Sequence, residues 1–196
     1  MQKERFEWIH SWCDETASTD LPRVLLVGDS ITHGYQEQVR ELLKGVCFVD
    51  YVSTSYSIDQ PIYNSLIKNF YFDSKYDVLH FNHGLHGKFM NVRTYKSRIK
   101  KLLSKLGCKK TIIASSTVSY LEGNKKIDKS WQKIIDKRNP ALKEIAKELG
   151  YLFNDLYRVS LTVPKEERTP EGVHYTKKGY EYFARQVAEK IKEILS

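Results

Sequence analysis

Three short segments of the chain carry residues that together could activate a hydroxyl group. Ser30 follows the apolar run VLLVG at residues 24–28, and His174 lies far downstream, three residues after Glu171. A serine hydroxyl is a weak nucleophile until a positioned histidine removes its proton, and a carboxylate can hold that histidine in the required orientation. The residue types therefore predict attack of Ser30 on a carbonyl carbon, with His174 as base and Glu171 as the acid that orients it.

The same segments also have a purely structural interpretation. A serine after a strand is typical of a turn and helix cap, in which Gly28 allows the tight turn and Asp29 bonds nearby amides. Glu171 and His174 could simply begin the last helix. Both interpretations stay open at the level of the sequence.

A third polar segment, LHFNHGLHGKF at residues 79–89, follows another apolar run. Asn82 and His86 could both direct side-chain N–H groups at a developing oxyanion. His80, His83 and His86 also have the spacing H-x-x-H-x-x-H, which suggests a metal site, but a strand directs His80 and His83 to opposite faces. We therefore expect no metal ion, and we expect His80 to be a packed strand residue.

The elements that must position these residues alternate between strand and helix patterns. Apolar, β-branched runs predict strands at residues 23–28, 46–52, 77–82, 111–116 and 151–156. Helical periodicity predicts helices at about 35–44, 60–70, 92–106, 131–149 and 176–195. Strands that are apolar throughout are typical of a parallel sheet covered by helices on both faces. The pattern predicts an α/β fold, a three-layer α/β/α sandwich with a central parallel sheet of about five strands and a site at their carboxyl ends.

Length and composition indicate one domain without a membrane span. The chain has 196 residues, with no repeat, no linker and no apolar stretch long enough to cross a bilayer. Its first residues lack the apolar core of a signal peptide, and Cys13, Cys47 and Cys108 match neither a disulfide framework nor a zinc site. We therefore expect a single domain over residues 1–196, with free thiols, in the cytoplasm unless a leader peptide has been removed.

The formal net charge of +8 is unevenly distributed, since no acidic residue lies between Asp77 and Glu122. Such a basic segment could bind nucleic acid or an acidic polymer. The apolar residues of 92–106 recur at helical spacing, however, so most of the cations fall on the wet side of an amphipathic helix. We expect a solvated helix face and no nucleic-acid partner.

Together, the three polar segments resemble the SGNH hydrolases, also called the GDSL-like lipase/acylhydrolase family, over most of the chain. Residues 28–31, GDSI, are similar to the first block of that family, whose serine is the nucleophile. Residues 84–87, GLHG, resemble the third block, usually Gly-x-Asn-Asp, and residues 171–174, EGVH, resemble the last, usually Asp-x-x-His. The resemblance implies a flavodoxin-like fold and a serine esterase that works through an acyl-enzyme without a metal or organic cofactor.

The sequence departs from the family pattern at two of the matched positions. Glu171 stands where the family usually has Asp, and a longer carboxylate can still orient a histidine. His86 stands where the family has the asparagine of its oxyanion hole, so an inward-facing imidazole N–H would have to take over that role. Asn82 is the alternative side-chain donor.

A third departure concerns the second block, which normally supplies a glycine amide. Residues 52–59, VSTSYSID, contain no glycine, and a backbone N–H near Ser55 is expected to serve instead. The resemblance thus implies an oxyanion hole built from the Ser30 amide, the Ser55 region and one side chain, with Gly84 supporting the loop that carries this side chain.

The expected substrate is a small acyl ester, such as an acetyl ester on a carbohydrate. A chain of 196 residues leaves little room for an apolar lid over bulky lipids, and its 13 tyrosines offer flat surfaces for sugars, although tyrosines also build cores. Lysophospholipase or thioesterase activity is the alternative within the family.

Other classes of protein also fit parts of the pattern. A non-catalytic family member that binds a glycan or a protein partner is favoured by His86 and by the missing second-block glycine. A nucleotide-binding domain would need G-x-G-x-x-G after the first strand, but residues 29–34 read DSITHG. The α/β-hydrolase fold usually places its serine in G-x-S-x-G, whereas Thr32 replaces the second glycine.

Overall fold

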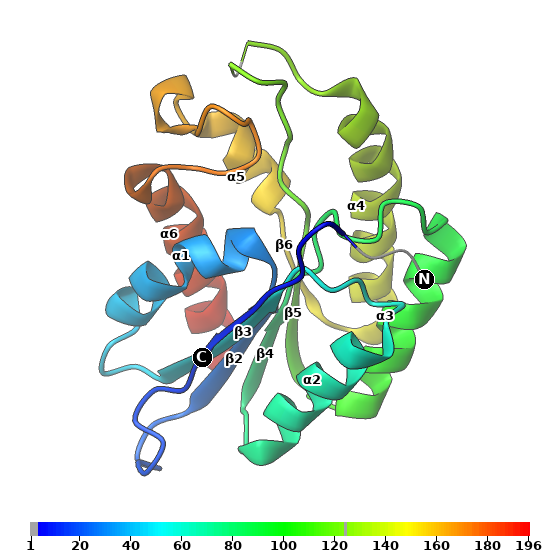
Figure 1. Cartoon of the computed structure of the whole chain (residues 1–196). Coiled ribbons are helices and arrows are strands. Elements are labelled where there is room, and N and C mark those ends of the chain that lie inside the picture. The colour runs from blue at the N-terminus through cyan, green and yellow to red at the C-terminus, as the bar shows by residue number, and fades with distance from the viewer. Residues whose placement is uncertain (1–3, 124) are drawn as a thin grey trace.

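The centre of the molecule is a mostly parallel β-sheet (Figure 1). A computed structural model describes residues 4–123 and 125–196, and in these residues the sheet has six strands in the order β1-β3-β2-β4-β5-β6. The strands are β1 (Ile9–Trp12), β2 (Arg23–Gly28), β3 (Phe48–Thr54), β4 (Val78–Phe81), β5 (Lys110–Ala114) and β6 (Leu152–Asn154). Strands β2 to β6 pair in parallel, whereas β1 runs antiparallel to β3.

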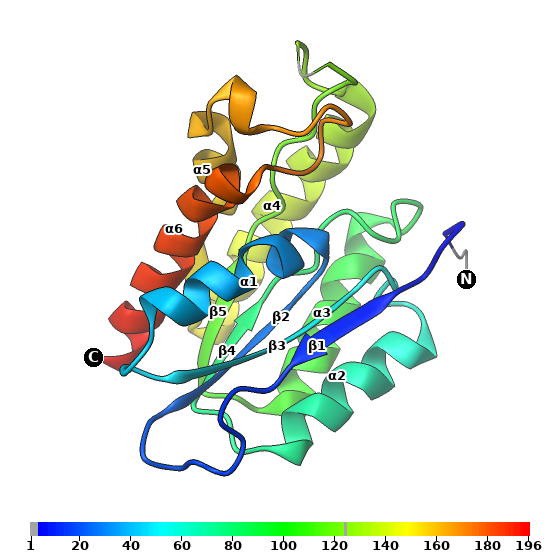
Figure 2. The same ribbon diagram turned by 60° about the vertical axis from the view of Figure 1, so that its left-hand side comes forward.

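Helices cover both faces of the sheet (Figures 1 and 2). They are α1 (Ser30–Leu42), α2 (Pro61–Asp73), α3 (Val92–Leu106), α4 (Lys129–Leu149), α5 (Leu156–Thr162) and α6 (Lys177–Leu195), with a 3-10 helix at Lys165–Glu167. Helices α1, α5 and α6 bury their apolar sides on one face, and α2, α3 and α4 bury theirs on the other. The predicted three-layer α/β/α sandwich is thereby confirmed.

Burial explains why the central strands are apolar throughout. All six residues of β2 and all seven of β3 are buried, because helices cover both sides of these strands. Parallel pairing requires crossover helices between successive strands, which accounts for the alternating pattern of the sequence.

The order of the strands determines where polar side chains meet. Strand β2 has β3 on one side and β4 on the other, so the chain reverses its direction across the sheet at β2 and β4. In open α/β sheets, ligands bind outside the carboxyl ends of the strands at this point. Ser30 follows β2 and the loop of residues 82–87 follows β4, so both predicted polar segments emerge at the switch point.

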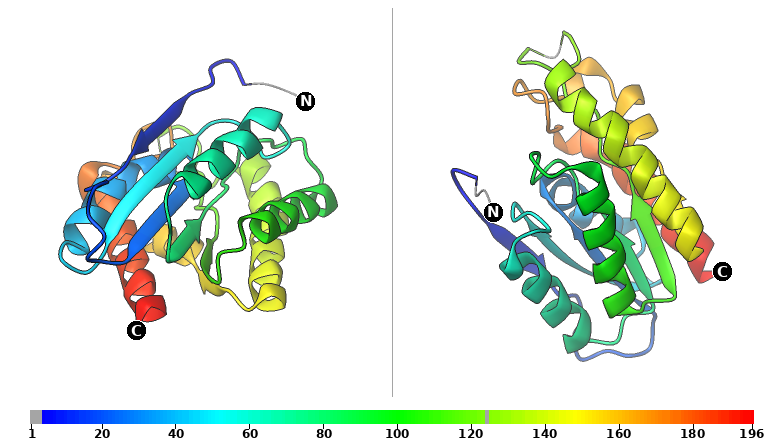
Figure 3. Two further views of the ribbon diagram at one scale, coloured as in Figure 1. Left: turned by 90° about the horizontal axis from the view of Figure 1, so that it is seen from below. Right: turned by 90° about the vertical axis from the view of Figure 1, so that its right-hand side faces the viewer.

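Strand β1, which the sequence pattern did not predict, forms the outer edge of the sheet (Figure 3). Its four residues are exposed, and its register pairs Ile9 with Thr54 and Trp12 with Tyr51. Because β1 is antiparallel to β3, its first residue lies at the same end of the sheet as the carboxyl ends of the parallel strands. Residues that precede β1 therefore lie at the end of the sheet from which the loops after β2 and β4 emerge.

The basic segment is the solvated helix face that the sequence predicts. In α3, Tyr95, Ile99 and Leu102 are buried, whereas Arg93 and Arg98 are exposed. Ion pairs also join this helix to α4, from Lys96 to Glu144 at 2.6 Å and from Lys100 to Glu148 at 2.5 Å. In the described ranges, no helix combines the length and the apolar character that crossing a membrane requires.

Candidate active site

Ser30 is the first residue of α1, directly after the turn that ends β2. Asp29 caps the helix, since its Oδ1 accepts a hydrogen bond of 3.0 Å from the amide of Ile31. Gly28 is required because a Cβ atom there would lie 1.8 Å from Oγ1 of Thr32. The turn therefore holds the Ser30 hydroxyl at the N-terminal end of α1, where the helix dipole favours negative charge.

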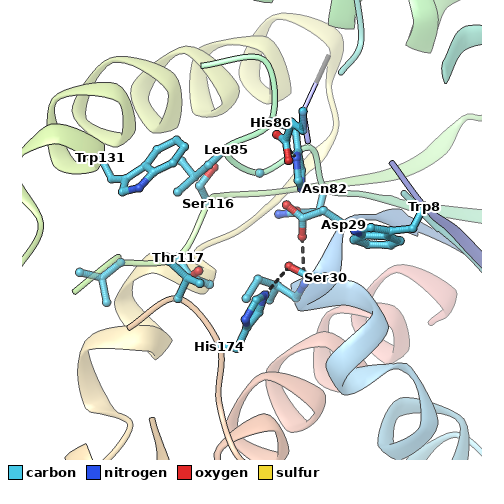
Figure 4. A pocket seen from close by; sticks show the side chains of 15 residues that line it. Trp8, Asp29, Ser30, Asn82, Leu85, His86, Ser116, Thr117, Trp131 and His174 are labelled. Atoms are coloured by element: carbon cyan, nitrogen blue, oxygen red, sulfur yellow. Dashed lines mark hydrogen bonds and ion pairs between the residues drawn. The ribbon is translucent and has the colours of Figure 1, made fainter. Parts of the chain in front are cut away.

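His174 and Glu171 lie within hydrogen-bond distance of one another and of Ser30. Nε2 of His174 is 2.8 Å from Oγ of Ser30, and Nδ1 of His174 is 2.9 Å from Oε1 of Glu171 (Figure 4 shows the first contact). With its Nδ1 proton donated to the carboxylate, the imidazole accepts the hydroxyl proton of Ser30 at Nε2. The structure thus brings the three sequence-predicted residues into one continuous chain of hydrogen bonds.

Glu171 is ionised at neutral pH. Burial would raise the pKa of its carboxyl group, but hydrogen bonds from Thr169, from its own backbone and from His174 outweigh burial and lower this pKa below the usual 4.5. The side chains of His174 and Glu171 remain 37% and 51% exposed, so solvent screens the interaction between them.

The loop that carries Glu171 and His174 is fixed by a second segment. Residues 117–123, called the finger here, extend from the end of β5. The Tyr120 amide donates a hydrogen bond of 2.8 Å to the carbonyl of Gly172, and the Gly123 amide donates one of 2.9 Å to the carbonyl of Pro170. Gly172 has a φ of +83°, and a Cβ atom there would lie 2.2 Å from the carbonyl oxygen of Tyr120. Only glycine fits this contact.

The short distance between Ser30 and His174 depends on two neighbouring helices. Ser30 begins α1, and α6 starts at Lys177, three residues after His174. The helices lie close together at Gly34 of α1, where a Cβ atom would be 2.1 Å from a ring carbon of Tyr180 in α6. The contact between hydroxyl and imidazole is therefore maintained by the packing of α1 against α6.

Ser30 and His174 open into a cavity of about 300 Å³. Its walls include the indole rings of Trp8 and Trp131, which lie on opposite sides of the serine (Figure 4). Leu85, Ser116, Thr117 and Val118 line the cavity as well. The cavity accordingly offers two flat apolar surfaces with the Ser30 hydroxyl between them.

His86 and Asn82, the two candidate side-chain donors, both line this cavity but differ in their bonding. Nδ2 of Asn82 donates to the carbonyl oxygens of Ala114 at 3.4 Å and Ser115 at 3.1 Å, so its amide hydrogens face β5. Nδ1 of His86 lies 2.7 Å from Oε1 of Glu4, which leaves Nε2 for another partner. In this arrangement the hydrogen bonds of Asn82 favour His86 over Asn82 as the side-chain donor.

The loop around His86 is held by a buried arginine. Arg138 of α4 donates hydrogen bonds to three carbonyl groups of this loop, those of Gly84 at 3.2 Å, His86 at 2.9 Å and Gly87 at 2.6 Å. Gly84 itself lies against Asp29, because a Cβ atom there would be 2.0 Å from Oδ2 of that residue. The absence of a side chain at Gly84 therefore allows the two loops to approach each other closely.

Ser55 does not face the cavity, contrary to the expectation for the second block. Its amide donates to the carbonyl oxygen of Trp8 at 3.3 Å, and its hydroxyl donates to Oε2 of Glu7 at 2.8 Å. The edge strand β1 and the residues before it occupy these groups. The segment after β3 therefore contributes no amide of Ser55 to an oxyanion hole.

The three spaced histidines have three different partners. Nε2 of His80 accepts a hydrogen bond from Asn154, Nε2 of His83 accepts one from the Ile58 amide, and His86 bonds to Glu4. Burial lowers the pKa of His80 to about 4. Within residues 4–123 and 125–196, no group of three or more His, Cys, Asp or Glu side chains is placed to hold a metal ion.

Four residues at or beside the cavity have no counterpart among the predicted site residues: Glu4, Trp8, Trp131 and Arg138. The predicted residues follow strands or precede the last helix, whereas Glu4 and Trp8 precede a strand, and Trp131 and Arg138 lie within α4. An antiparallel edge strand at the N-terminus would have been the signal for the first two, but four exposed residues give no apolar pattern.

Comparison with known proteins identifies similar folds. No family model matches the chain, and no curated protein matches it in sequence at the threshold applied. A lipase/acylhydrolase from Enterococcus faecalis has a TM-score of 0.70 at 18% identity, covering 88% of this chain and 96% of that chain. An acetylxylan esterase from Geobacillus stearothermophilus has a TM-score of 0.67 at 18% identity, with 87% and 94% covered.

An α/β hydrolase from the metagenome of Lake Arreo, Spain, has a TM-score of 0.71 at 12% identity, covering 89% of this chain and 97% of that chain. Two further structures of the Geobacillus stearothermophilus esterase are described as catalytic mutants, one with a serine and one with a histidine changed to alanine. This chain therefore shares the fold of solved acylhydrolases and acetylxylan esterases over nearly its whole length.

Proposed function

We propose that the protein is a carboxylic ester hydrolase of the SGNH type, with Ser30 as nucleophile. The observation that carries the proposal is the 2.8 Å contact between Oγ of Ser30 and Nε2 of His174, inside a cavity that can hold an ester. The fold shared with solved esterases and the three sequence blocks support the same function.

The reaction follows from the direction of the hydrogen bonds. Oγ of Ser30 attacks the ester carbonyl while its proton passes to Nε2 of His174, and Glu171 stabilises the imidazolium that forms. The tetrahedral intermediate collapses, the proton moves from Nε2 to the leaving alkoxide, and an alcohol departs from the acyl-enzyme. Water then attacks the acyl group, gives its proton to His174, and the second intermediate releases the acid and restores the Ser30 hydroxyl.

Two donors are available for the oxyanion. The Ser30 amide belongs to the first turn of α1, whose N–H groups have no partner inside the helix. Nε2–H of His86 is the second donor, because Glu4 occupies only Nδ1. Because the carboxylate of Glu4 accepts the Nδ1 proton, the protonated imidazole, which carries a second proton on Nε2, can in this way serve in place of the family's asparagine.

The substrate we favour is a small acyl ester, such as an acetyl group on a carbohydrate. A cavity of about 300 Å³ is at the low end for ligand sites, which disfavours a long acyl chain. The indoles of Trp8 and Trp131 provide apolar faces against which sugar rings can rest. A panel of aryl esters of graded acyl length should give the highest kcat/KM with acetyl, and a preference for long chains would favour the lysophospholipase or thioesterase alternative.

A binding function without catalysis is the second candidate. The specific observation in its favour is that the Ser55 amide, which stands in the second block, is bonded to Trp8. Treatment with a fluorophosphonate probe followed by intact-mass measurement separates the two functions. We expect one adduct on the wild type and none on Ser30→Ala or His174→Ala; an unlabelled, folded wild type would exclude the esterase and favour the binding function.

A further inference from the structure

The residues before and within β1 reach the cavity from the edge of the sheet. We call residues 4–12 the N-terminal arm (Figure 3). Glu4 and Trp8 of the arm line the same cavity as Ser30 and His86. The Trp8 ring stands edge-on to the ring of His86, with a distance of 6.5 Å between centroids. Part of the cavity wall thus comes from a segment outside the three sequence blocks.

Ser55 fastens this arm to the sheet. Its hydroxyl accepts a hydrogen bond of 2.9 Å from the Trp8 amide and donates one of 2.8 Å to Glu7, while its amide bonds to the Trp8 carbonyl. Thr54 adds a hydrogen bond of 2.7 Å from its Oγ1 to the same carbonyl. The segment from which a second-block amide was expected therefore holds the arm.

Glu4 is the residue of the arm that contacts a candidate donor. Its Oε1 lies 2.7 Å from Nδ1 of His86, whose side chain is only 18% exposed. A carboxylate at this distance accepts the Nδ1 proton and fixes the ring, so the remaining nitrogen of His86 must serve the cavity. Arg138 holds the backbone of the same loop from the opposite side through the carbonyl of His86.

The charges around His86 favour its protonated form. Burial opposes protonation, but the hydrogen bond to Glu4 and the negative charges of Asp29, Glu4 and Glu7 outweigh burial and raise the pKa of His86. A cation, Arg138 of α4, also lies against this loop, where its guanidinium binds the backbone carbonyls.

His83 precedes His86 in the same loop and does not compete for the proton. Burial, with the charges of Arg138 and His86, holds the pKa of His83 well below 6.5. Its Nε2 accepts the Ile58 amide proton, as a neutral imidazole does. Of these two histidines, His86 is therefore the one whose surroundings favour the protonated form.

We propose that Glu4 is a positioning residue that keeps His86 as an imidazolium, with Nε2–H directed at the oxyanion that forms on the substrate of Ser30. This inference rests on the proposed esterase function. The site has no amide from Ser55, and Glu4 of the arm instead makes His86 a charged donor. Hydrogen bonds from charged donors are roughly twice as strong as neutral ones.

The coupling between Glu4 and His86 is measured without turnover. Imidazole ¹H–¹⁵N spectra of the Ser30→Ala protein, recorded against pH, report the titration of His86, which is assigned by its loss in His86→Asn. Glu4→Gln should lower the pKa of His86. Phe6→Ala is the matched control, at an arm residue that is 72% exposed, and it should leave the pKa of His86 unchanged. If His86 has the same pKa with Glu4 as in the Glu4→Gln variant, the proposal is overturned.

The catalytic consequence is measured by a double-mutant cycle. Glu4→Gln should lower kcat about tenfold at pH 8 with less than about a twofold change in KM, and should move the alkaline loss of activity to lower pH. In the His86→Asn background, whose neutral amide needs no charge, Glu4→Gln should have no effect. Equal losses in both backgrounds would mean that Glu4 acts only through the stability of the arm.

The outcomes also separate this inference from the proposed function. A wild type that hydrolyses no ester and takes no fluorophosphonate overturns the esterase function, and with it the catalytic role of Glu4. The titration in Ser30→Ala still decides whether Glu4 controls the charge of His86. An active wild type with an unchanged Glu4→Gln profile overturns only the role of Glu4.

Discussion

The amide nitrogen of Tyr120 donates a hydrogen bond of 2.8 Å to the carbonyl oxygen of Gly172, which joins the finger to the loop that carries Glu171 and His174. Neither residue takes part in the proposed chemistry. The position of the proposed base nevertheless depends on the finger, because this bond and the bond of 2.9 Å from the Gly123 amide to the Pro170 carbonyl add to the bonds within the loop's own turn. We therefore expect the proposed catalysis to be sensitive to a backbone contact beside the three residues.

Replacement of Gly172 by alanine tests this dependence. The added Cβ atom would meet the carbonyl oxygen of Tyr120 at 2.2 Å, so the loop must move. Misplacement of a catalytic group by about 1 Å can cost about a hundredfold in rate. We expect kcat of Gly172→Ala to fall by about that factor, measured on an aryl acetate, with circular dichroism unchanged.

The matched control for that change is Gly45→Ala. Gly45 also has a positive φ, +76°, but nothing lies within 4 Å of a Cβ atom built there. Both variants carry the backbone cost of about 1 kcal/mol, and only Gly172→Ala adds a collision. Equal activity of the two variants would show that the contact with Tyr120 does not position His174.

Substitution of Glu171 by glutamine separates the charge of the carboxylate from its shape. The amide oxygen can still accept the Nδ1 proton of His174, but it carries no charge to stabilise the imidazolium. Because Glu171 is half exposed and screened, we expect a loss in kcat of about 10² to 10³, less than for a buried acid. Glu166→Gln, at an exposed acid of the preceding 3-10 helix, should retain full activity. A Glu171→Gln enzyme with unchanged kcat would exclude the acid from the triad.

Acid should destabilise the fold through buried histidines. His80 is fully buried with a pKa of about 4, whereas a histidine in the unfolded chain titrates near 6.5. Between these values the unfolded state binds more protons, so the free energy of unfolding falls as the pH falls, by about 3 kcal/mol for His80 alone. Urea unfolding at pH 7, 6, 5 and 4 measures this slope.

The His80→Asn variant tests whether His80 causes this dependence of stability on pH. His80→Asn should lower the stability at pH 7, because the buried site is altered, but it should flatten the dependence on pH. His83, which also has a pKa well below 6.5, keeps part of the slope in this variant. Parallel stability curves for wild type and His80→Asn would show that His80 does not contribute.

The buried pair of Arg23 and Asp50 anchors the connection between β1 and β2. Their atoms Nη1 and Oδ1 are 2.9 Å apart, Tyr76 donates to the same carboxylate at 2.8 Å, and Arg23 also binds the carbonyl of Asp14. Asp50→Asn leaves the guanidinium without its counter-charge, and we expect a loss of about 3 kcal/mol in urea unfolding. Asp73→Asn, at an exposed aspartate, should change stability by less than about 0.5 kcal/mol. A comparable effect of both variants would contradict the anchoring role.

Much of the fold followed from the sequence because parallel strands and amphipathic helices leave strong patterns. The strand predicted at 23–28 and the helix predicted at 92–106 coincide with β2 and α3. The helix predicted from residue 35 begins earlier, at Ser30, since the side chain of Asp29 caps it there. Strand β1 was missed because its exposed residues are paired on one side only, so burial imposes no alternation on them.

The hydrogen bonds that join Ser30, His174 and Glu171 could be predicted from the sequence, because each residue lies in a short motif at the boundary of a helix or strand. The donors around the expected oxyanion could not be predicted, because their orientation depends on tertiary contacts. Asn82 follows a strand, as a donor should, but its amide is directed to the carbonyls of β5. Ser55 occupies the expected block, but its polar groups are taken by a segment that is remote in the sequence.

The two layers of helices support different parts of the site, and this gives heat inactivation two distinguishable routes. Ser30 and His174 depend on α1 and α6, whereas the loop of His86 hangs from Arg138 of α4 on the other face. Loosening of the first layer would separate nucleophile from base and end reaction with a suicide inhibitor. Loosening of the second layer would leave Ser30 reactive toward the inhibitor but would lower kcat. In partly inactivated samples, the ratio of inhibitor labelling to turnover would therefore show which layer loosens first.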